Sequence, residues 1–138
     1  MNAHERMFIT AFVEPSRRDR FLEFLARPKT RGKFREELFH RKSRFLLQKF
    51  LTPVTGHQRN ASELYSILKK MGSPNVCWVI GGQFDAQEID LKQALEQVED
   101  GVIISCLPGE LAYFKSEDEE FIIHAVGCLA HVPQPRRS

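Results

Sequence analysis

The chain has 138 residues, the usual size of one domain, and it can bury a hydrophobic core without disulfide or metal support. Hydrophobic residues make up 42% of it and charged residues 28%, which is typical of a soluble globular protein and excludes a mostly disordered chain. The apolar run near the start is too short for a signal-peptide core or a membrane span, so we expect a cytoplasmic protein with no membrane contact.

The first half of the chain is predicted to be helical. The run from Met7 to Val13 is rich in β-branched and aromatic residues and indicates either a strand or the start of a buried helix. After it, apolar residues recur at helical spacing as far as Pro28, which predicts a helix at about residues 17–27.

Residues 30–51 are also helical in composition, but their pattern is not that of one straight helix. Such a helix would place four cations between two rows of apolar side chains: Arg31, Arg35, Lys42 and Lys49. One solution is a break near residues 40–43, with Ser43 capping a second helix. The other is that the aliphatic stems lie along the apolar surface and bring the charges to a groove or a partner. We favour the break.

The second half predicts two capped helices and a series of strands. Asn60 with Glu63 and Asp90 with Gln93 have the three-residue spacing of a capping box, and each pair begins an apolar helical pattern. The strands are expected at residues 76–80, 102–107, 110–115 and 120–126. Because a helix connects the first two of these strands, we expect them to be parallel, and the last three to form an antiparallel meander.

The predicted fold class is therefore α+β, with a helical basic N-terminal half packed on a small mixed sheet of order β-α-β-β-β that ends in an antiparallel meander. We expect one domain over residues 1–126, with its basic helical part at about 16–51 and its sheet-forming part at about 60–126. Residues 127–138 are expected to be a flexible tail.

The pair Pro108-Gly109 has the residue preferences of a type II turn and sets the register of the last hairpins. This register places Leu107 opposite Glu110, and it divides the strand residues between two faces. One face is a core face and includes Leu107. The other face is apolar with polar tips and is either covered or an interface, with three residues of interest: Tyr113, Leu111 and His124.

Cys106 is the sharpest candidate for a catalytic residue, as a nucleophile activated by His124. The register places these two side chains two strands apart, with Leu111 between them, which disfavours a direct contact. The three cysteines, at positions 77, 106 and 128, have the spacing of neither a zinc site nor a redox pair. No metal and no cofactor are expected, and we lean against an enzyme.

Charge is distributed unevenly along the chain. Residues 1–60 contain fourteen Lys and Arg against six Asp and Glu, a net charge of +8, whereas residues 61–138 contain six against twelve, a net charge of −6. This separation suggests an acidic partner for the first part or a contact between the two parts. Further cations, at positions 27, 29 and 33, lie where the helix at 17–27 meets the next segment.

These observations favour a small binding or regulatory protein, such as an accessory or immunity-type subunit, whose basic helices contact an acidic protein partner or a second copy. The first alternative is a nucleic-acid-binding subunit that uses the same cations on phosphates, and the second is a cysteine-dependent enzyme. The candidate binding residues are Arg17, Arg18, Arg20, Arg31, Arg35, Arg41, Lys42 and Lys49.

Overall fold

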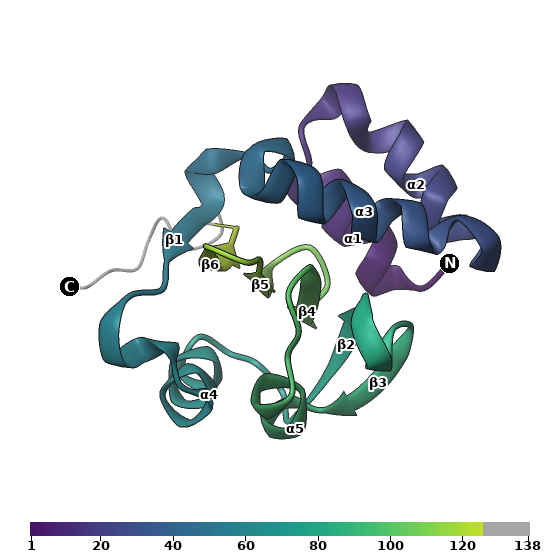
Figure 1. Ribbon diagram of the computed structural model, residues 1–138. Coiled ribbons are helices and arrows are strands. Elements are labelled where there is room, and N and C mark those ends of the chain that lie inside the picture. The colour runs from purple at the N-terminus through teal and green to yellow at the C-terminus, as the bar shows by residue number, and fades with distance from the viewer. Residues whose placement is uncertain (126–138) are drawn as a thin grey trace.

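A six-stranded sheet lies between two layers of helices in the computed structural model, which describes residues 1–125 (Figure 1). Helices α1 to α3 cover one face of the sheet, and helices α4 and α5 cover the other. The α+β class and the helical N-terminal half are therefore confirmed. The predicted tail at 127–138, including Cys128, lies outside the described residues.

The apolar run near the start of the chain forms a helix, α1 (Ala3–Phe12), and not a strand. Asn2 caps it, because its side-chain oxygen accepts hydrogen bonds from the first backbone amides of the helix. Phe8, Ile9 and Phe12 make up the buried side of α1, which packs on the sheet. A helix buried on one side explains why this stretch carries so many large apolar residues.

The predicted helix at 17–27 is confirmed as α2 (Arg18–Ala26), and α3 (Arg31–Arg41) follows it after a short 3-10 turn. The predicted break after α3 is also confirmed, since Lys42 takes a positive φ of 53° that does not continue a right-handed helix. Residues Lys42–Phe45 form a 3-10 turn, and no second α-helix follows before residue 61.

The proposed role of Ser43 as a helix cap is wrong. Its hydroxyl donates a hydrogen bond to the carboxylate of Glu119, 3.0 Å away, and no helix begins at this position. The reason is tertiary: the acidic turn between the last two strands approaches Ser43 and supplies the acceptor.

The rest of the chain supplies the sheet and the second helical layer. Both predicted caps are confirmed, because the Asn60 side chain accepts from the amide of Glu63 and the Asp90 side chain accepts from the amide of Gln93. The elements are β1 (Leu51–Pro53), α4 (Ala61–Lys70), β2 (Val76–Ile80), β3 (Gln87–Asp90), α5 (Leu91–Glu96), β4 (Val102–Leu107), β5 (Leu111–Lys115) and β6 (Glu120–His124).

The strand order is β1-β6-β5-β4-β2-β3, and all neighbouring strands are antiparallel. The expected parallel pairing of residues 76–80 with 102–107 is wrong, since Trp78 lies opposite Ser105 and Ile80 opposite Ile103 in an antiparallel register. The unpredicted strand β3 turns the chain back along β2 before α5 begins. Helix α5 therefore connects β3 to β4, which run in the same direction on either side of β2.

The predicted meander is confirmed, and so is most of its register. Ile104 lies opposite Tyr113 and Leu111 opposite His124, as expected. The turn hydrogen bond from the Glu110 amide to the Leu107 carbonyl is present at 3.0 Å. A β-bulge between Ser105 and Leu107 shifts the end of the hairpin, so that Leu107 pairs with Leu111 and joins the opposite face from the one predicted.

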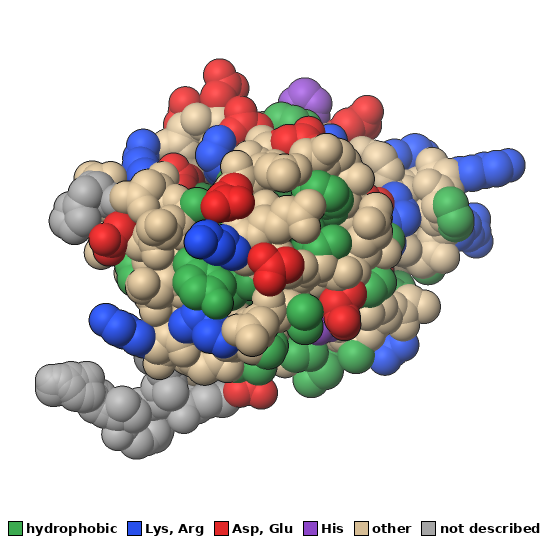
Figure 2. Space-filling model, turned by 90° about the horizontal axis from the view of Figure 1, so that it is seen from below, with side chains coloured by type: hydrophobic (Ala, Val, Ile, Leu, Met, Phe, Trp, Pro, Cys, Tyr) green, Lys and Arg blue, Asp and Glu red, His purple; other side chains and the backbone are tan. Residues whose placement is uncertain are grey.

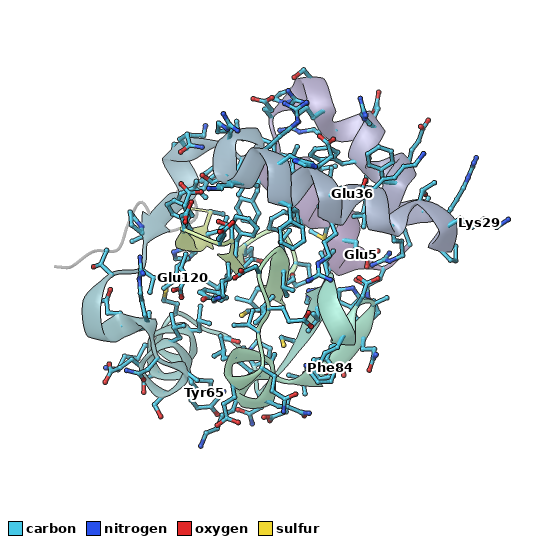
Figure 3. All side chains as sticks on the ribbon, in the orientation of Figure 1. Glu5, Lys29, Glu36, Tyr65, Phe84 and Glu120 are labelled. Carbon is cyan, nitrogen blue, oxygen red and sulfur yellow. The ribbon has the colours of Figure 1, made fainter. Side chains whose placement is uncertain are left out.

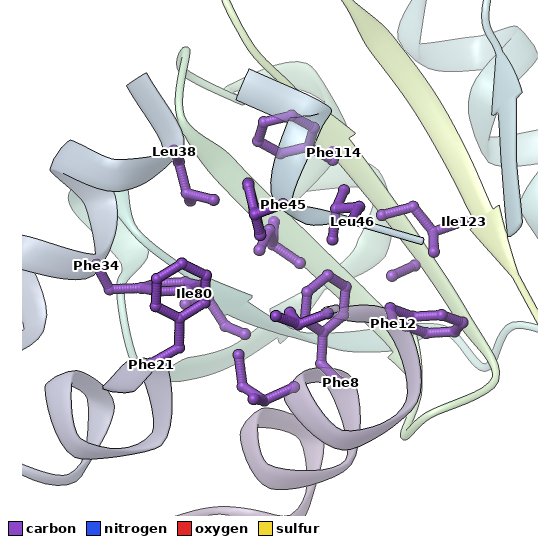
Figure 4. Close-up of a cluster of buried hydrophobic side chains, with 14 of the residues drawn as sticks. Phe8, Phe12, Phe21, Phe34, Leu38, Phe45, Leu46, Ile80, Phe114 and Ile123 are labelled. Carbon is purple, nitrogen blue, oxygen red and sulfur yellow. The ribbon is translucent and has the colours of Figure 1, made fainter. Parts of the chain in front are cut away.

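The two faces of the sheet bury different cores. The face under α1 to α3 is rich in phenylalanine (Figure 4). Some of these rings are in edge-on contact, such as those of Phe21 and Phe45, whose ring centroids are 5.4 Å apart. The face under α4 and α5 is mainly aliphatic and contains Cys77 and Cys106. Both faces are thus covered by the chain itself.

Candidate functional site

Two groups of basic residues from the first half differ most clearly in the folded chain. One group lies at the junction between α3 and the sheet and pairs with acidic residues of the second half. The other group is exposed where α2 meets α3. The charge separation along the sequence is therefore partly neutralised within one molecule, and the exposed group keeps its charge at the surface.

Arg31 is the centre of the first group. Its guanidinium donates two hydrogen bonds to Asp85, both 2.8 Å, and two to Glu5, at 3.0 and 2.7 Å. A fifth bond, of 3.0 Å, goes to the backbone carbonyl of Leu25. A guanidinium has five N–H donors, so Arg31 has none left for a ligand. The Trp78 indole N–H adds a bond of 2.9 Å to Glu5.

We call this group of Arg31, Glu5, Asp85 and Trp78 the Arg31 clasp. It joins α1, α3, β2 and the turn after β2, and the Glu5 side chain at its centre is only 2% exposed. The hydrogen bonds to Asp85 raise the pKa of Arg31 above its ordinary value. Burial acts to raise the pKa of Asp85, but hydrogen bonds from Arg31 and the Gly81 amide outweigh it and hold that pKa below its ordinary value.

Arg35 lies one turn further along α3 and contacts the loop before β4. Its guanidinium donates to the Asp100 carbonyl at 3.0 Å and to the Glu99 carboxylate at 3.3 Å, while its Nε atom is buried without a partner among the described residues. Both side chains of this pair are about one-third exposed or more, so the pair is weaker than the Arg31 clasp.

The Gly81-Gly82 turn beside Arg35 has a structural reason to contain glycine. Gly81 has a φ of +96°, and a Cβ atom there would lie 2.8 Å from the Gly101 carbonyl oxygen. The close approach of this turn to β4 therefore explains the glycine without a phosphate ligand.

Three more of the predicted binding residues pair with carboxylates. Arg17 and Arg41 contact Glu14 and Glu37 within their own helical segments, at 2.8 and 2.7 Å. Lys42 pairs with Asp118 in the acidic turn between β5 and β6, and this contact raises the pKa of Lys42. These side chains are consequently less available to an acidic partner than the sequence suggested.

The other three predicted binding residues have no ion pair among residues 1–125. The Arg18 side chain donates to the carbonyl of Val13, 2.8 Å away. The Arg20 guanidinium lies 5.3 Å from the ring centre of Phe24, and the Lys49 ammonium lies 5.1 Å from that of Phe50. Arg20 and Lys49 thus lie over apolar rings while their side chains remain exposed.

The exposed group consists of Arg27, Lys29 and Lys33, which we call the basic corner. All three side chains are exposed, and none has a carboxylate partner in the described part of the chain. Figure 3 shows Lys29 at the far end of the molecule, directed to the solvent. Lys and Arg side chains also project from this end in the view from below (Figure 2).

The structure does not support Cys106 as a nucleophile. Its side chain is 1% exposed, and burial raises its pKa to about 11, which keeps the thiol protonated at neutral pH. Cys77 is similarly buried, and its pKa is raised to about 12. His124 lies opposite Leu111 on β6, and burial lowers its pKa.

The second face of the sheet, expected to be either covered or an interface, is not a free surface. Tyr113 and Leu111 are both fully buried beneath the second helical layer, and His124 is half-buried. The Tyr113 hydroxyl donates to the Glu120 carboxylate, and burial raises the pKa of Tyr113. Of the two expectations for this face, covered or an interface, the structure shows Tyr113 and Leu111 covered by the chain's own helices.

A serine and a histidine that the sequence did not connect are in contact. The His4 Nδ1 atom lies 2.7 Å from the Ser105 hydroxyl oxygen, and the His4 ring stacks on Trp78 with centroids 6.4 Å apart. Ser105 is only 1% exposed, and burial lowers the pKa of His4. A substrate could not reach this serine, so we interpret the pair as a buried polar contact between α1 and the sheet.

A groove of about 330 Å³ runs beside the Arg31 clasp, and we call it the Trp78 groove. It lies where the start of α1, the end of α2 and the turn after β2 meet. Its mouth adjoins the basic corner, because Pro28, between Arg27 and Lys29, forms part of its wall. Its lining includes Glu5, Leu25, Ala26, Pro28, Arg31 and Trp78, together with Asn2 from the start of the chain.

Sequence reasoning missed the acidic and aromatic members of this site. Glu5 stands between His4 and Arg6, before the apolar run from Met7 to Val13, so its local sequence does not mark it as buried. Trp78 offered a weak signal, as the one tryptophan of the chain in an apolar strand. No local pattern could have linked either residue to Arg31.

None of the helices in the described residues has the length and apolar character that crossing a membrane requires. Within residues 1–125, no three His, Cys, Asp or Glu side chains gather in a way that could hold a metal ion. No protein-family model matches the chain, and neither a curated protein nor a solved structure matches it.

Proposed function

We propose that this chain is a small binding protein that uses the basic corner to contact an acidic surface of a protein partner. The observation that carries the proposal is the contrast in pairing. Arg31, Arg35 and Lys42 are bound to carboxylates of the same chain, whereas Arg27, Lys29 and Lys33 are exposed and unpaired among the described residues. Exposed cations where two helices meet favour association with a surface of opposite charge.

The surroundings of the basic corner favour a protein partner over nucleic acid. The groove between α2 and α3 places Lys33 and Arg20 beside three carboxylates, those of Glu23, Glu36 and Glu37. A phosphate backbone is negative along its whole length, so these carboxylates would repel it. A protein surface can present cations opposite them and acids opposite the basic corner, which makes the mixed pattern a basis for specificity.

The proposal is tested by charge reversal in a matched pair of variants. Arg27→Glu/Lys29→Glu changes the basic corner, and Lys70→Glu/Lys92→Glu makes the same change of charge at exposed positions of α4 and α5. Affinity purification from the native host, followed by quantitative mass spectrometry, should recover an acidic protein with the wild type and the control pair. Recovery with the basic-corner pair should be lost. Equal recovery with both variants would contradict the proposal.

Two further measurements separate the alternatives. Fluorescence anisotropy with a generic DNA duplex and a single strand should show no binding at low salt; tight binding that falls steeply with salt would support the nucleic-acid function instead. Light scattering should give a mass that does not change in the Arg27→Glu/Lys29→Glu variant. An oligomer that dissociates in this variant would show that the partner is a second copy of the chain.

A further inference from the structure

The Trp78 groove has a polar floor whose hydrogen-bonding capacity is already used. All five N–H donors of Arg31 are bound within the chain, and both carboxylate oxygens of Glu5 accept from Arg31. The indole N–H of Trp78 also donates to Glu5. A polar ligand such as a sugar or a phosphate would find few free partners on this floor, and its desolvation would not be compensated.

The walls of the groove, by contrast, are mainly apolar, apart from Asn2, whose side-chain oxygen already caps α1. Leu25 and Ala26 come from the end of α2, Pro28 from the turn that follows it, and Trp78 from β2. The volume of about 330 Å³ is at the lower end of the range for small ligand pockets and is enough for a bulky aliphatic side chain. The groove therefore favours an apolar group.

The position of the groove determines what else such a ligand must carry. Pro28 belongs to its wall, and the residues on either side of Pro28 are the exposed cations Arg27 and Lys29. A chain that placed an apolar side chain in the groove would bring its neighbouring residues next to the basic corner. Carboxylates at those neighbouring positions would complement the two cations.

We propose that the Trp78 groove is a specificity pocket for one large apolar side chain, presented by an acidic peptide segment of the partner. The proposal rests on the proposed function, which supplies the acidic partner, and it adds the feature of that partner that the pocket selects. The residues that dominate protein interfaces cluster near the centre of the contact in desolvated pockets, and an apolar side chain in the groove would take such a place.

The chain contains its own reporter for this proposal, because Trp78 is its one tryptophan. The probes are two synthetic peptides without tryptophan, acetyl-Asp-Glu-Leu-Glu-Asp-amide and the same peptide with glycine in place of leucine. On the wild-type protein, the leucine peptide should bind about tenfold tighter or more, which corresponds to burial of one aliphatic side chain. It should also change the emission of Trp78, whereas the glycine peptide should not.

A groove-filling variant supplies the second arm of the experiment. Ala26→Phe places a ring in the groove from an exposed helix position, without a change of charge, and Ser62→Phe on the exposed side of α4 is the matched control. The preference for leucine should disappear in Ala26→Phe and remain in Ser62→Phe. Circular dichroism should show that both variants are folded.

The outcomes distinguish this inference from the proposed function. If both peptides bind wild type equally and both lose binding in Arg27→Glu/Lys29→Glu, the pocket is overturned while the basic corner retains its role. If neither peptide binds although the native partner is recovered through the basic corner, the pocket is overturned as well. A leucine preference that survives in Ala26→Phe would place the apolar contact elsewhere and would also contradict the inference.

Discussion

Arg31 and Lys29 are two residues apart in the sequence, yet the regions around them differ in almost every physical property. The Arg31 clasp is largely shielded from water, and each of its donors has an acceptor within the chain. The basic corner is exposed, and its cations have no carboxylate partner in the described part of the molecule. A cationic side chain therefore holds the fold together in one region and is exposed to the solvent in the other.

The difference shows that net charge along a sequence is a poor guide to a binding surface. The excess of positive charge in residues 1–60 is partly matched by acids of the second half, through Arg31, Arg35 and Lys42. Fewer cations therefore remain unpaired than the net charge of residues 1–60 suggests. The contrast between the two regions can be tested with four predictions.

Replacement of Arg31 should have the largest effect. Arg31→Ala leaves the Glu5 carboxylate buried without its cation, and loss of one partner of a buried ion pair costs about 3–5 kcal/mol in the free energy of unfolding. Urea denaturation followed by circular dichroism measures the loss. Lys29→Ala is the matched control and should change the free energy by less than about 0.5 kcal/mol. Similar losses in both variants would remove the distinction between the regions.

Asp85→Asn should have a smaller effect that depends on pH. At neutral pH it weakens charge-assisted hydrogen bonds to Arg31, which are worth about 1.5–3 kcal/mol. The pKa of Asp85 in the folded chain is below its ordinary value of 3.8, so its stabilisation is complete above that value and is lost as the pH falls through the folded pKa.

The difference in unfolding free energy between wild type and Asp85→Asn should therefore be constant near neutral pH and shrink in acid, below the ordinary pKa of the carboxyl. Denaturation series at several pH values measure it. A difference that did not depend on pH would show that Asp85 acts through packing and not through its charge.

Arg35→Met should change stability only slightly, by less than about 1 kcal/mol, because its pair with Glu99 is partly exposed. The substitution keeps an unbranched apolar stem and removes the buried Nε atom that has no partner. Thermal denaturation compared with Arg31→Ala checks the ranking. A loss as large as that of Arg31→Ala would mean that Arg35 belongs to the same buried network.

The basic-corner variant Arg27→Glu/Lys29→Glu should have the smallest effect on folding. Exposed substitutions of this kind usually change the free energy of unfolding by about 0.5 kcal/mol or less each. Its effect on partner recovery should be the largest of the four. A strongly destabilised variant would show that these cations have contacts within the fold, and the basic corner would then not be a free surface.

Several parts of the fold could be predicted because their signals are local. The helix at 17–27, the break after residue 41, and the caps at Asn60 and Asp90 each depend on residues within one or two helical turns. The hairpin register followed from the Pro108-Gly109 turn as far as the β-bulge. The bulge itself has no local signal, and it moved Leu107 to the other face.

The strand β3 escaped prediction because its sequence, Gln-Glu-Ile-Asp, is mostly polar and exposed at the edge of the sheet. Without it, α5 seemed to link two neighbouring parallel strands. The candidate site was also predicted incompletely, because ion pairs between distant segments have no local signal. The sequence pointed to eight cations, five of which prove to be paired with carboxylates, and the three exposed cations of the basic corner were not among the eight.

The sequence by itself determined the α+β class, the helical first half and the presence of unbalanced charge, because composition and short-range periodicity carry this information. Only the tertiary structure decided which charges are free. Arg31 meets Asp85 across 54 residues of chain, and Trp78 meets Glu5 across 73. Such contacts depend on how the helical layer docks on the sheet, and no periodic pattern in either segment specifies the partner in the other.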